Sequence, residues 1–258
     1  MIDFHSHIVY DVDDGSESLE SSINILKEAE KAGFDKIILT PHYWEDYYEV
    51  GKRDIKRKIT ELQEICDKEN INIKLYQANE IYISNDITEF INTNKASTIN
   101  DSRYVLFEVP LRGEPFNLLE VIYKLKENGN IPILAHPERY EFVQKEPNRL
   151  LELVEEGVLL QSNYGSIIGQ YGECANKTVK LLLQNNFIHF FGSDVHKMGH
   201  IYQEMPKVKE ELSKIISQEK IEELSLTNIE KVLNNEEIEI EMPSQIKTSI
   251  FSKLLKKI

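Results

Sequence analysis

Short apolar runs that end in histidine or a carboxylate recur along this chain, and they limit its fold more than any other feature. The first run leads directly into His5-Ser6-His7. Residues i and i+2 of an extended strand point the same way, so these two imidazoles would share one face. By itself the pair fits either a metal site or two histidines at a strand end. The later runs end at His42, Glu80, Glu108, His136 and, within one motif, Asp194 and His196.

Helical stretches separate these runs and predict an α/β fold. Apolar residues recur with a helical period from Ser16 or Ser18 to Ala32, and similar stretches occupy 53–70, 86–93, 116–129, 147–157 and 175–185. Strands are expected in the N-terminal run and at 37–40, 73–80, 104–108, 131–136, 158–161 and 188–192. Seven strands that alternate with helices indicate right-handed crossovers. In a β/α barrel the C-terminal ends of all strands open onto one mouth, where the strand-end side chains would meet.

Nine side chains are therefore candidate metal ligands at that mouth. Asp14, in the acidic loop after the first run, joins the strand-end residues. Imidazole and carboxylate together suit borderline divalent metals such as Zn, Mn and Fe without choosing among them. The alternative for each single histidine is a structural residue. The full candidate set is His5, His7, Asp14, His42, Glu80, Glu108, His136, Asp194 and His196.

The charges also indicate a cation at the mouth. Four carboxylates in one low-dielectric cleft would repel one another, so a bound cation is expected to neutralise them. The formal net charge of −14 argues against nonspecific nucleic-acid binding, which needs a basic surface. Anionic substrates stay open because bound metals reverse the local sign. With 258 residues and 41% hydrophobic content, the chain is long enough for one large barrel.

The cysteines and the hydropathy narrow the class further. Cys66 and Cys174 lie in predicted helices, and neither is followed six residues later by arginine. A phosphatase with a cysteine nucleophile is therefore not supported, and two reduced helix thiols are expected. The N-terminus has no basic-then-apolar signal segment, and no apolar run approaches the ~20 residues of a membrane span. We expect a cytoplasmic protein.

Several motifs together resemble the PHP (polymerase and histidinol phosphatase) metallophosphoesterases. The motifs are His5-Ser6-His7 with Asp13-Asp14-Gly15, Thr40-Pro41-His42, Glu80, Glu108, His136-Pro137-Glu138-Arg139-Tyr140 and Ser193-Asp194-Val195-His196. The opening up to Gly15, together with 100–104, is similar to the CpsB/YwqE-type tyrosine-protein phosphatases of bacterial capsule and exopolysaccharide systems. The resemblance covers residues 1–235, which we expect to form one domain, with 236–258 as a C-terminal extension.

The resemblance implies a distorted (β/α)7 TIM-like barrel with three divalent metals at its C-terminal mouth, Mn first and Fe or Zn as alternatives. The ligand sets that it implies are His5, His7, Glu80 and Asp194 for one ion, Glu80, Glu108 and His136 for the second, and Asp14, His42 and His196 for the third. Arg139 would grip phosphate as a planar fork, and a surface salt bridge is its alternative role. Arg139, His136 and Asp194 are the expected catalytic residues.

The implied reaction is hydrolysis of phosphotyrosine on a protein, with the tail of a bacterial tyrosine kinase as the expected partner. A small-molecule phosphoesterase such as a histidinol phosphatase is one alternative, and a metal-bound scaffolding domain without turnover is another. The family branch often has a further arginine after Ser-Asp-x-His, whereas the loop here reads Lys197-Met-Gly-His-Ile. Lys197 and His200 are the candidates to replace it.

Three further segments have more than one interpretation. Residues 43–48 are aromatic and acidic and follow His42, so they form either a capping loop or a lid or wall beside the site. Residues 236–241 alternate acidic residues with isoleucine, as an edge strand or a solvated stretch does. The basic, amphipathic tail 245–258 is either a packed or frayed helix or a peripheral contact with a partner or a membrane surface.

Overall fold

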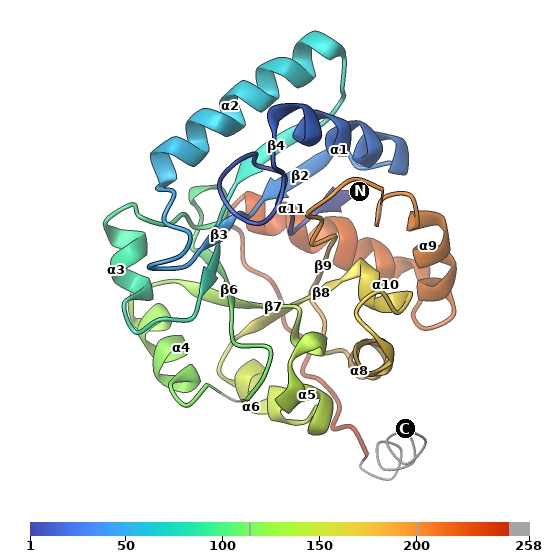
Figure 1. Ribbon diagram of the computed structural model, residues 1–258. Coiled ribbons are helices and arrows are strands. Elements are labelled where there is room, and N and C mark those ends of the chain that lie inside the picture. The colour runs from blue at the N-terminus through green and yellow to red at the C-terminus, as the bar shows by residue number, and fades with distance from the viewer. Residues whose placement is uncertain (114, 200, 248–258) are drawn as a thin grey trace.

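The computed structural model describes residues 1–113, 115–199 and 201–247, and it has a curled parallel sheet at its centre with helices around it (Figure 1). The strands form two sheets, in the orders β1-β2-β4 and β3-β5-β6-β7-β8-β9, and each of these neighbouring pairs is parallel. The strands are β1 (Ile2–Asp3), β2 (Lys36–Leu39), β3 (His42–Tyr43), β4 (Lys74–Gln77), β5 (Glu80–Tyr82), β6 (Tyr104–Glu108), β7 (Ile131–Ala135), β8 (Leu159–Asn163) and β9 (Phe190–Gly192). The predicted α/β class is therefore confirmed.

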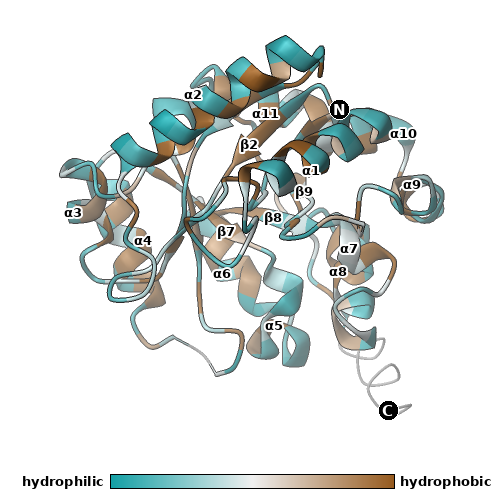
Figure 2. Ribbon diagram, turned by 45° about the horizontal axis from the view of Figure 1, so that its top comes forward, coloured by the Kyte–Doolittle hydropathy of each residue, from teal (hydrophilic) through white to brown (hydrophobic). Residues whose placement is uncertain are grey.

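The helices cover the outside of the sheet, with hydrophilic outer faces that are plain on α1 and α2 (Figure 2). Helix α1 begins after Ser18, which accepts a hydrogen bond from the Ser21 N–H, and ends at Gly33 in the left-handed region. The helices are α1 (Leu19–Ala32), α2 (Lys52–Glu69), α3 (Ile87–Asn92), α4 (Leu118–Glu127), α5 (Glu141–Lys145), α6 (Arg149–Glu155), α7 (Tyr164–Ile167), α8 (Glu173–Gln184), α9 (Met205–Ser213), α10 (Gln218–Glu222) and α11 (Asn228–Leu233). The described residues also include two 3-10 turns, η1 (Ile99–Asp101) and η2 (Pro137–Arg139), and a π-helical segment, η3 (Glu223–Thr227).

Two of the predicted strands are interrupted, which divides the sheet into its two parts. The stretch predicted at 37–40 continues past Pro41 as β3, and the stretch at 73–80 breaks before β5. Pro41 has no N–H to donate to a neighbouring strand. Asn79 donates its amide to the Pro41 carbonyl at 2.9 Å and accepts the Ser97 N–H at 2.9 Å. The paired breaks place His42 directly opposite Glu80 in the β3–β5 register.

The segments that follow β1 and β9 lie side by side, although they come from opposite ends of the chain. Ser6 and Val195 form an isolated parallel bridge. The Asp194 N–H donates to the His5 carbonyl at 2.8 Å. Gly192 permits this approach because a Cβ there would lie 2.5 Å from His5 Cβ. The first and last ligand motifs therefore become neighbours.

The interior beneath these strand ends is filled with apolar side chains. Ile2, Ile38 and Leu106 belong to one buried cluster, which helix α11 extends with Ile229 and Val232. The inward faces of strands from both sheets therefore share one core, and strand ends rise from a packed base.

The C-terminal segment that the structure describes packs against the domain without forming a strand. The edge strand considered for 236–241 is absent there, although Ile238 is buried. Tyr104 donates its hydroxyl to the Glu236 carbonyl at 2.5 Å, and Asn148 and Ile246 exchange two hydrogen bonds of 2.9 Å. The predicted tail beyond Lys247 lies outside the described residues. Among the helices of residues 1–113, 115–199 and 201–247, none is both long and apolar enough to cross a membrane.

We predict that Gly192→Ala lowers the thermal stability, because the new methyl group would overlap His5. Overpacking of this kind costs about 1–3 kcal/mol and is measured as a lower Tm. Gly51→Ser is the control, because a Cβ at that helix cap meets no atom within 4 Å. Equal melting temperatures for the two variants would contradict a tight approach at Gly192.

Candidate metal centre

Glu80, at the start of β5, is fully buried and lies at the centre of the ligand cluster. Its Oε2 atom lies 3.2 Å from His5 Nε2 and 3.3 Å from His7 Nε2. The same oxygen lies 3.1 Å from His42 Nδ1, while Oε1 lies 2.9 Å from His136 Nε2. One carboxylate therefore contacts four imidazoles that come from three separate parts of the chain.

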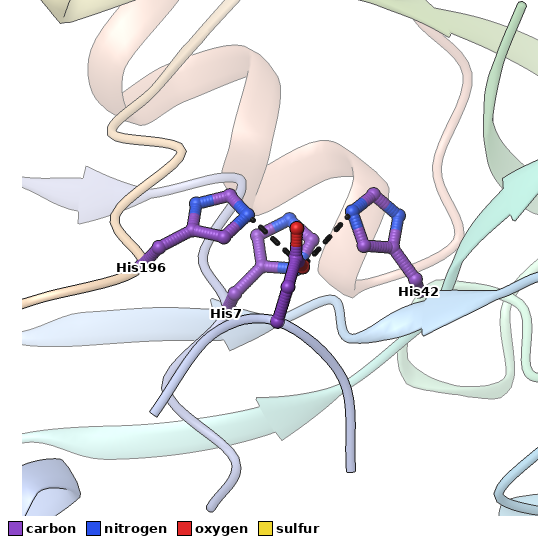
Figure 3. A group of neighbouring side chains, drawn as sticks. His7, His42 and His196 are labelled. Atoms are coloured by element: carbon purple, nitrogen blue, oxygen red, sulfur yellow. Dashed lines mark ion pairs between the residues drawn. The ribbon is translucent and has the colours of Figure 1, made fainter. Parts of the chain in front are cut away.

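Asp14 joins the cluster from the loop that follows β1. His42 and His196 both form ion-pair contacts with the Asp14 carboxylate, and Figure 3 shows their imidazoles with that of His7 between them. Asp14 Oδ1 lies 3.5 Å from His42 Nε2 and 3.4 Å from His196 Nε2. The loop folds back tightly at Gly15, where a Cβ would lie 2.2 Å from the His7 carbonyl oxygen. The Asp-Gly pair therefore brings the carboxylate over the His-x-His face.

Asp194 and Glu108 complete the cluster at its edges. Asp194 Oδ1 lies 3.7 Å from His5 Nε2 and 3.6 Å from His196 Nδ1. Glu108 Oε1 lies 3.1 Å from His42 Nδ1. Contacts of this length link all nine predicted side chains into one continuous cluster.

The donor atoms fit divalent cations. His42 Nδ1 and Glu80 Oε2 are buried 3.1 Å apart, yet neither has a hydrogen-bond partner. Lone pairs that converge in this way, from imidazole and carboxylate, suit Mn, Fe or Zn. Three overlapping groups have ligand atoms within 4.8 Å of one another: His7, Asp14, His42 and His196; His5, His7 and Glu80; and His42, Glu80 and Glu108. In the third group His42 takes the place that the resemblance implied for His136.

The electrostatics of the cluster show an excess of negative charge. Burial lowers the pKa of His5, but the carboxylates of Glu80 and Asp194 outweigh it and raise the pKa to about 9. Burial also lowers the pKa of His42, but Glu80 and Glu108 outweigh this effect and raise the pKa to about 10. Burial also opposes the ionised form of Glu80, yet the imidazoles hold its pKa well below the usual value. The Glu80 carboxylate therefore stays charged, and either protons on the imidazoles or metal ions must balance it.

Outer contacts fix the orientation of the candidate ligands, and sequence reasoning missed them. Gln161 Oε1 lies 2.9 Å from His5 Nδ1, which leaves Nε2 to face the cluster. Asn163 donates its amide to Asp194 Oδ2 at 2.7 Å. Such partners orient ligands and tune their basicity. The available signal was the i, i+2 spacing of two amides at the end of β8.

Arg139 follows His136 in the turn η2 and points its guanidinium at the cluster. Its Nη1 atom donates to Asp194 Oδ2 at 2.6 Å, and its guanidinium carbon lies 4.4 Å from the centre of the Tyr171 ring. Burial lowers the pKa of Arg139, but Asp194 and other neighbouring groups outweigh this effect, so the pKa is raised above its usual value. Its partner is a carboxylate of the cluster, so a simple surface salt bridge does not describe it.

Two cavities open onto the cluster, and Arg139 lines both. The first, of about 460 Å³, also exposes Arg112, which sequence reasoning missed although it lies four residues after the end of β6. The second, of about 490 Å³, is lined by Lys197, whose Nζ lies 3.5 Å from Glu17 Oε1. The other candidate to replace the missing arginine, His200, lies outside the described residues.

Comparison with known proteins assigns this arrangement to a family. The family model "Capsular polysaccharide synthesis, CpsB/CapC" matches residues 1–234. The chain belongs to the CpsB/CapC family. The family expected from the motifs of the sequence is therefore confirmed.

Relatives in the CpsB/CapC family span most of the chain. The tyrosine-protein phosphatase YwqE of Bacillus subtilis (strain 168) is 31% identical over 77% of this chain and 78% of its own. The tyrosine-protein phosphatase CpsB of Streptococcus pneumoniae is 28% identical over 90% of this chain and 98% of its own. A solved structure from work on YwqE and CpsB, described as unique metal-dependent tyrosine phosphatases, has a TM-score of 0.87 at 30% identity. The structural match covers 96% of this chain and 100% of the chain in the solved structure.

We predict that Asp13→Asn weakens metal binding by this CpsB/CapC protein. Asp13 Oδ2 lies 2.8 Å from His7 Nδ1 and accepts the His42 N–H at 2.9 Å. Loss of such a partner typically costs about 10–100-fold in metal affinity, which titration calorimetry measures directly. Asp11→Asn is the matched control, because the Asp11 side chain is 84% exposed. Equal affinities for the two variants would contradict the role of Asp13.

Proposed function

We propose that this protein is a metal-dependent tyrosine-protein phosphatase. The observation that carries the proposal is the cavity whose base holds the convergent imidazoles and carboxylates beside Arg139. Family membership and the names of the relatives support the same reaction. The proposed substrate is a phosphotyrosyl protein, namely the tail of a bacterial tyrosine kinase that controls capsular or exopolysaccharide synthesis.

We further propose that the curled sheet is a distorted (β/α)7 barrel whose mouth binds three divalent ions, Mn first and Fe or Zn as alternatives. The proposed ligands are His5, His7, Glu80 and Asp194; Glu80, Glu108 and His136; and Asp14, His42 and His196. When bound, such ions lower the pKa of coordinated water and polarise phosphoryl oxygens. Their six positive charges would exceed the four negative charges of the carboxylates, so the site would attract a phosphate dianion in an acidic protein.

Arg139 would bind the phosphoryl group from the side of the cavity. Asp194 and the Tyr171 ring hold its guanidinium in place, so little side-chain freedom is lost when phosphate binds. A planar guanidinium can donate two parallel hydrogen bonds to phosphate oxygens. A phenol has a pKa of ~10, so the tyrosyl oxygen leaves without a strong general acid.

The proposal assigns catalysis to residues 1–235 and treats 236–258 as an extension. All nine candidate ligands and Arg139 lie within the first part, and the family model ends at residue 234. The described part of the extension packs through Ile238 and Ile246, away from the ligand cluster in sequence. A peripheral contact through the basic tail remains our proposal for the last residues.

Metal removal tests the reaction class. A chelator should abolish phosphate release from a phosphotyrosyl peptide, and Mn²⁺ should be tried first for its recovery, with metal analysis of the same samples.

The double variant Cys66→Ser, Cys174→Ser should keep its activity, because neither thiol lies in the cluster. Chelator-resistant activity that disappears in the double variant would overturn the mechanism. Faster release from histidinol phosphate than from the peptide would favour a small-molecule phosphoesterase.

We predict that Arg139→Ala lowers turnover of the phosphotyrosyl peptide by about 10²-fold or more, because a fixed positive charge at the phosphoryl group is lost. The metal content should not change, since Asp194 keeps its hydrogen bonds from Asn163 and Tyr171. Steady-state kinetics together with metal analysis separate the two effects. Wild-type turnover in the variant would remove Arg139 from the site.

A further inference from the structure

The cavity above the ligand cluster has a second layer that the chemistry of phosphate does not explain. Tyr82 follows Glu80 by two residues on β5, so both side chains point to the same face. Trp44 stands in the same relation to His42, and His42 pairs with Glu80. The two aromatic residues therefore each follow a candidate metal ligand by two positions, Tyr82 pairs with Glu108 in the β5–β6 register, and both rings line the cavity.

The aromatic side chains stack in two pairs. The rings of Trp44 and Tyr82 stack with their centres 4.2 Å apart and an interplanar angle of 13°. The ring of Tyr48, which also lines the cavity, stacks on the imidazole of His42 at 5.8 Å and 16°. Trp44 and Tyr48 exchange two backbone hydrogen bonds of 3.0 and 2.7 Å, which close the loop between them. Contacts within the chain therefore hold these rings in place.

The loop after β6 lines the same cavity with Val109, Pro110 and Leu111. Strand β5 lies between β3 and β6 in the sheet, so this loop and the aromatic loop flank the end of β5. The Val109 N–H donates to the Tyr140 hydroxyl at 3.2 Å, and the Leu111 carbonyl accepts the Glu141 N–H at 3.0 Å. An anchored, mostly apolar segment therefore faces the space beside the aromatic layer.

We propose that Trp44, Tyr48 and Tyr82 form the binding site for the aryl ring of the substrate ester and make the protein selective for aryl over alkyl phosphate monoesters. The inference rests on the proposed function, which puts the phosphoryl group at the ligand cluster. Trp44 and Tyr82 lie two residues beyond His42 and Glu80, about 6.6 Å along an extended chain, a distance that an ester-linked phenyl ring spans and the short side chain of phosphoserine does not. A preformed site binds the ring without a cost for ordering it.

Calorimetry of the Mn²⁺-loaded protein with benzylphosphonate, whose CH2 group takes the place of the ester oxygen before the phenyl ring, and with methylphosphonate tests this selectivity without turnover. The wild type should bind the benzyl compound about tenfold more tightly or better, from ring burial and stacking. Trp44→Leu and Tyr82→Leu should each reduce that preference by about tenfold, with less than about a twofold change for methylphosphonate. Tyr82→Phe should keep the preference, because it keeps the ring.

Tyr123→Leu is the control variant, since Tyr123 is 60% exposed on α4 and is not among the residues that line the cavity. Its preference should equal that of the wild type. An unchanged preference in the Trp44 and Tyr82 variants would overturn the proposal. An equal loss of both compounds would also overturn it, because the aromatic pair would then only support the metal ligands. Absence of phosphotyrosine hydrolysis by the wild type would instead count against the proposed function.

Discussion

Buried negative charge is the constraint on which the rest of this structure depends. Glu80 is fully buried and contacts four imidazoles, and three further carboxylates lie around it. Such a group of carboxylates is unstable in a low-dielectric site unless positive charge balances it. The raised pKa values of His5 and His42 show that protons on these imidazoles can supply this positive charge. Divalent ions would supply more positive charge in less space. The outer contacts of Gln161 and Asp13 then hold the rings where such ions would bind.

The architecture supplies this arrangement by bringing distant segments together at one end of a curled sheet. The interruptions at Pro41 and Asn79 set His42 opposite Glu80. The bridge between Ser6 and Val195 brings the first ligand motif beside the last one, although the two motifs are more than half the chain apart in sequence. The β3–β5 register and the Ser6–Val195 bridge are backbone contacts, so the sheet fixes the positions of most ligand side chains, whereas Asp14 comes from the loop after β1.

The two-residue repeat of an extended strand places the proposed metal ligands and the proposed aryl-binding residues on the same face. Successive inward positions on β5 carry Glu80 and then Tyr82, and the chain at β3 carries His42 and then Trp44. The lower layer offers charged ligand atoms, and the upper layer offers flat apolar surface. A phosphate ester of a phenol has the same two parts in the same order.

The sequence by itself determined the family, the α/β class and the set of candidate ligands beside the strands, whereas the structure places His42 and Glu80 at the starts of β3 and β5. Those features are local: the period of a strand places His5 and His7 together, and a serine cap and a glycine end define α1. Only the tertiary structure decided which ligand atoms meet, such as His42 with Glu108, and which residues support them, such as Gln161. It also decided the breaks in two strands and the stacking of Trp44 on Tyr82. These depend on register and curvature between strands far apart in the chain, and no local pattern of residues encodes them.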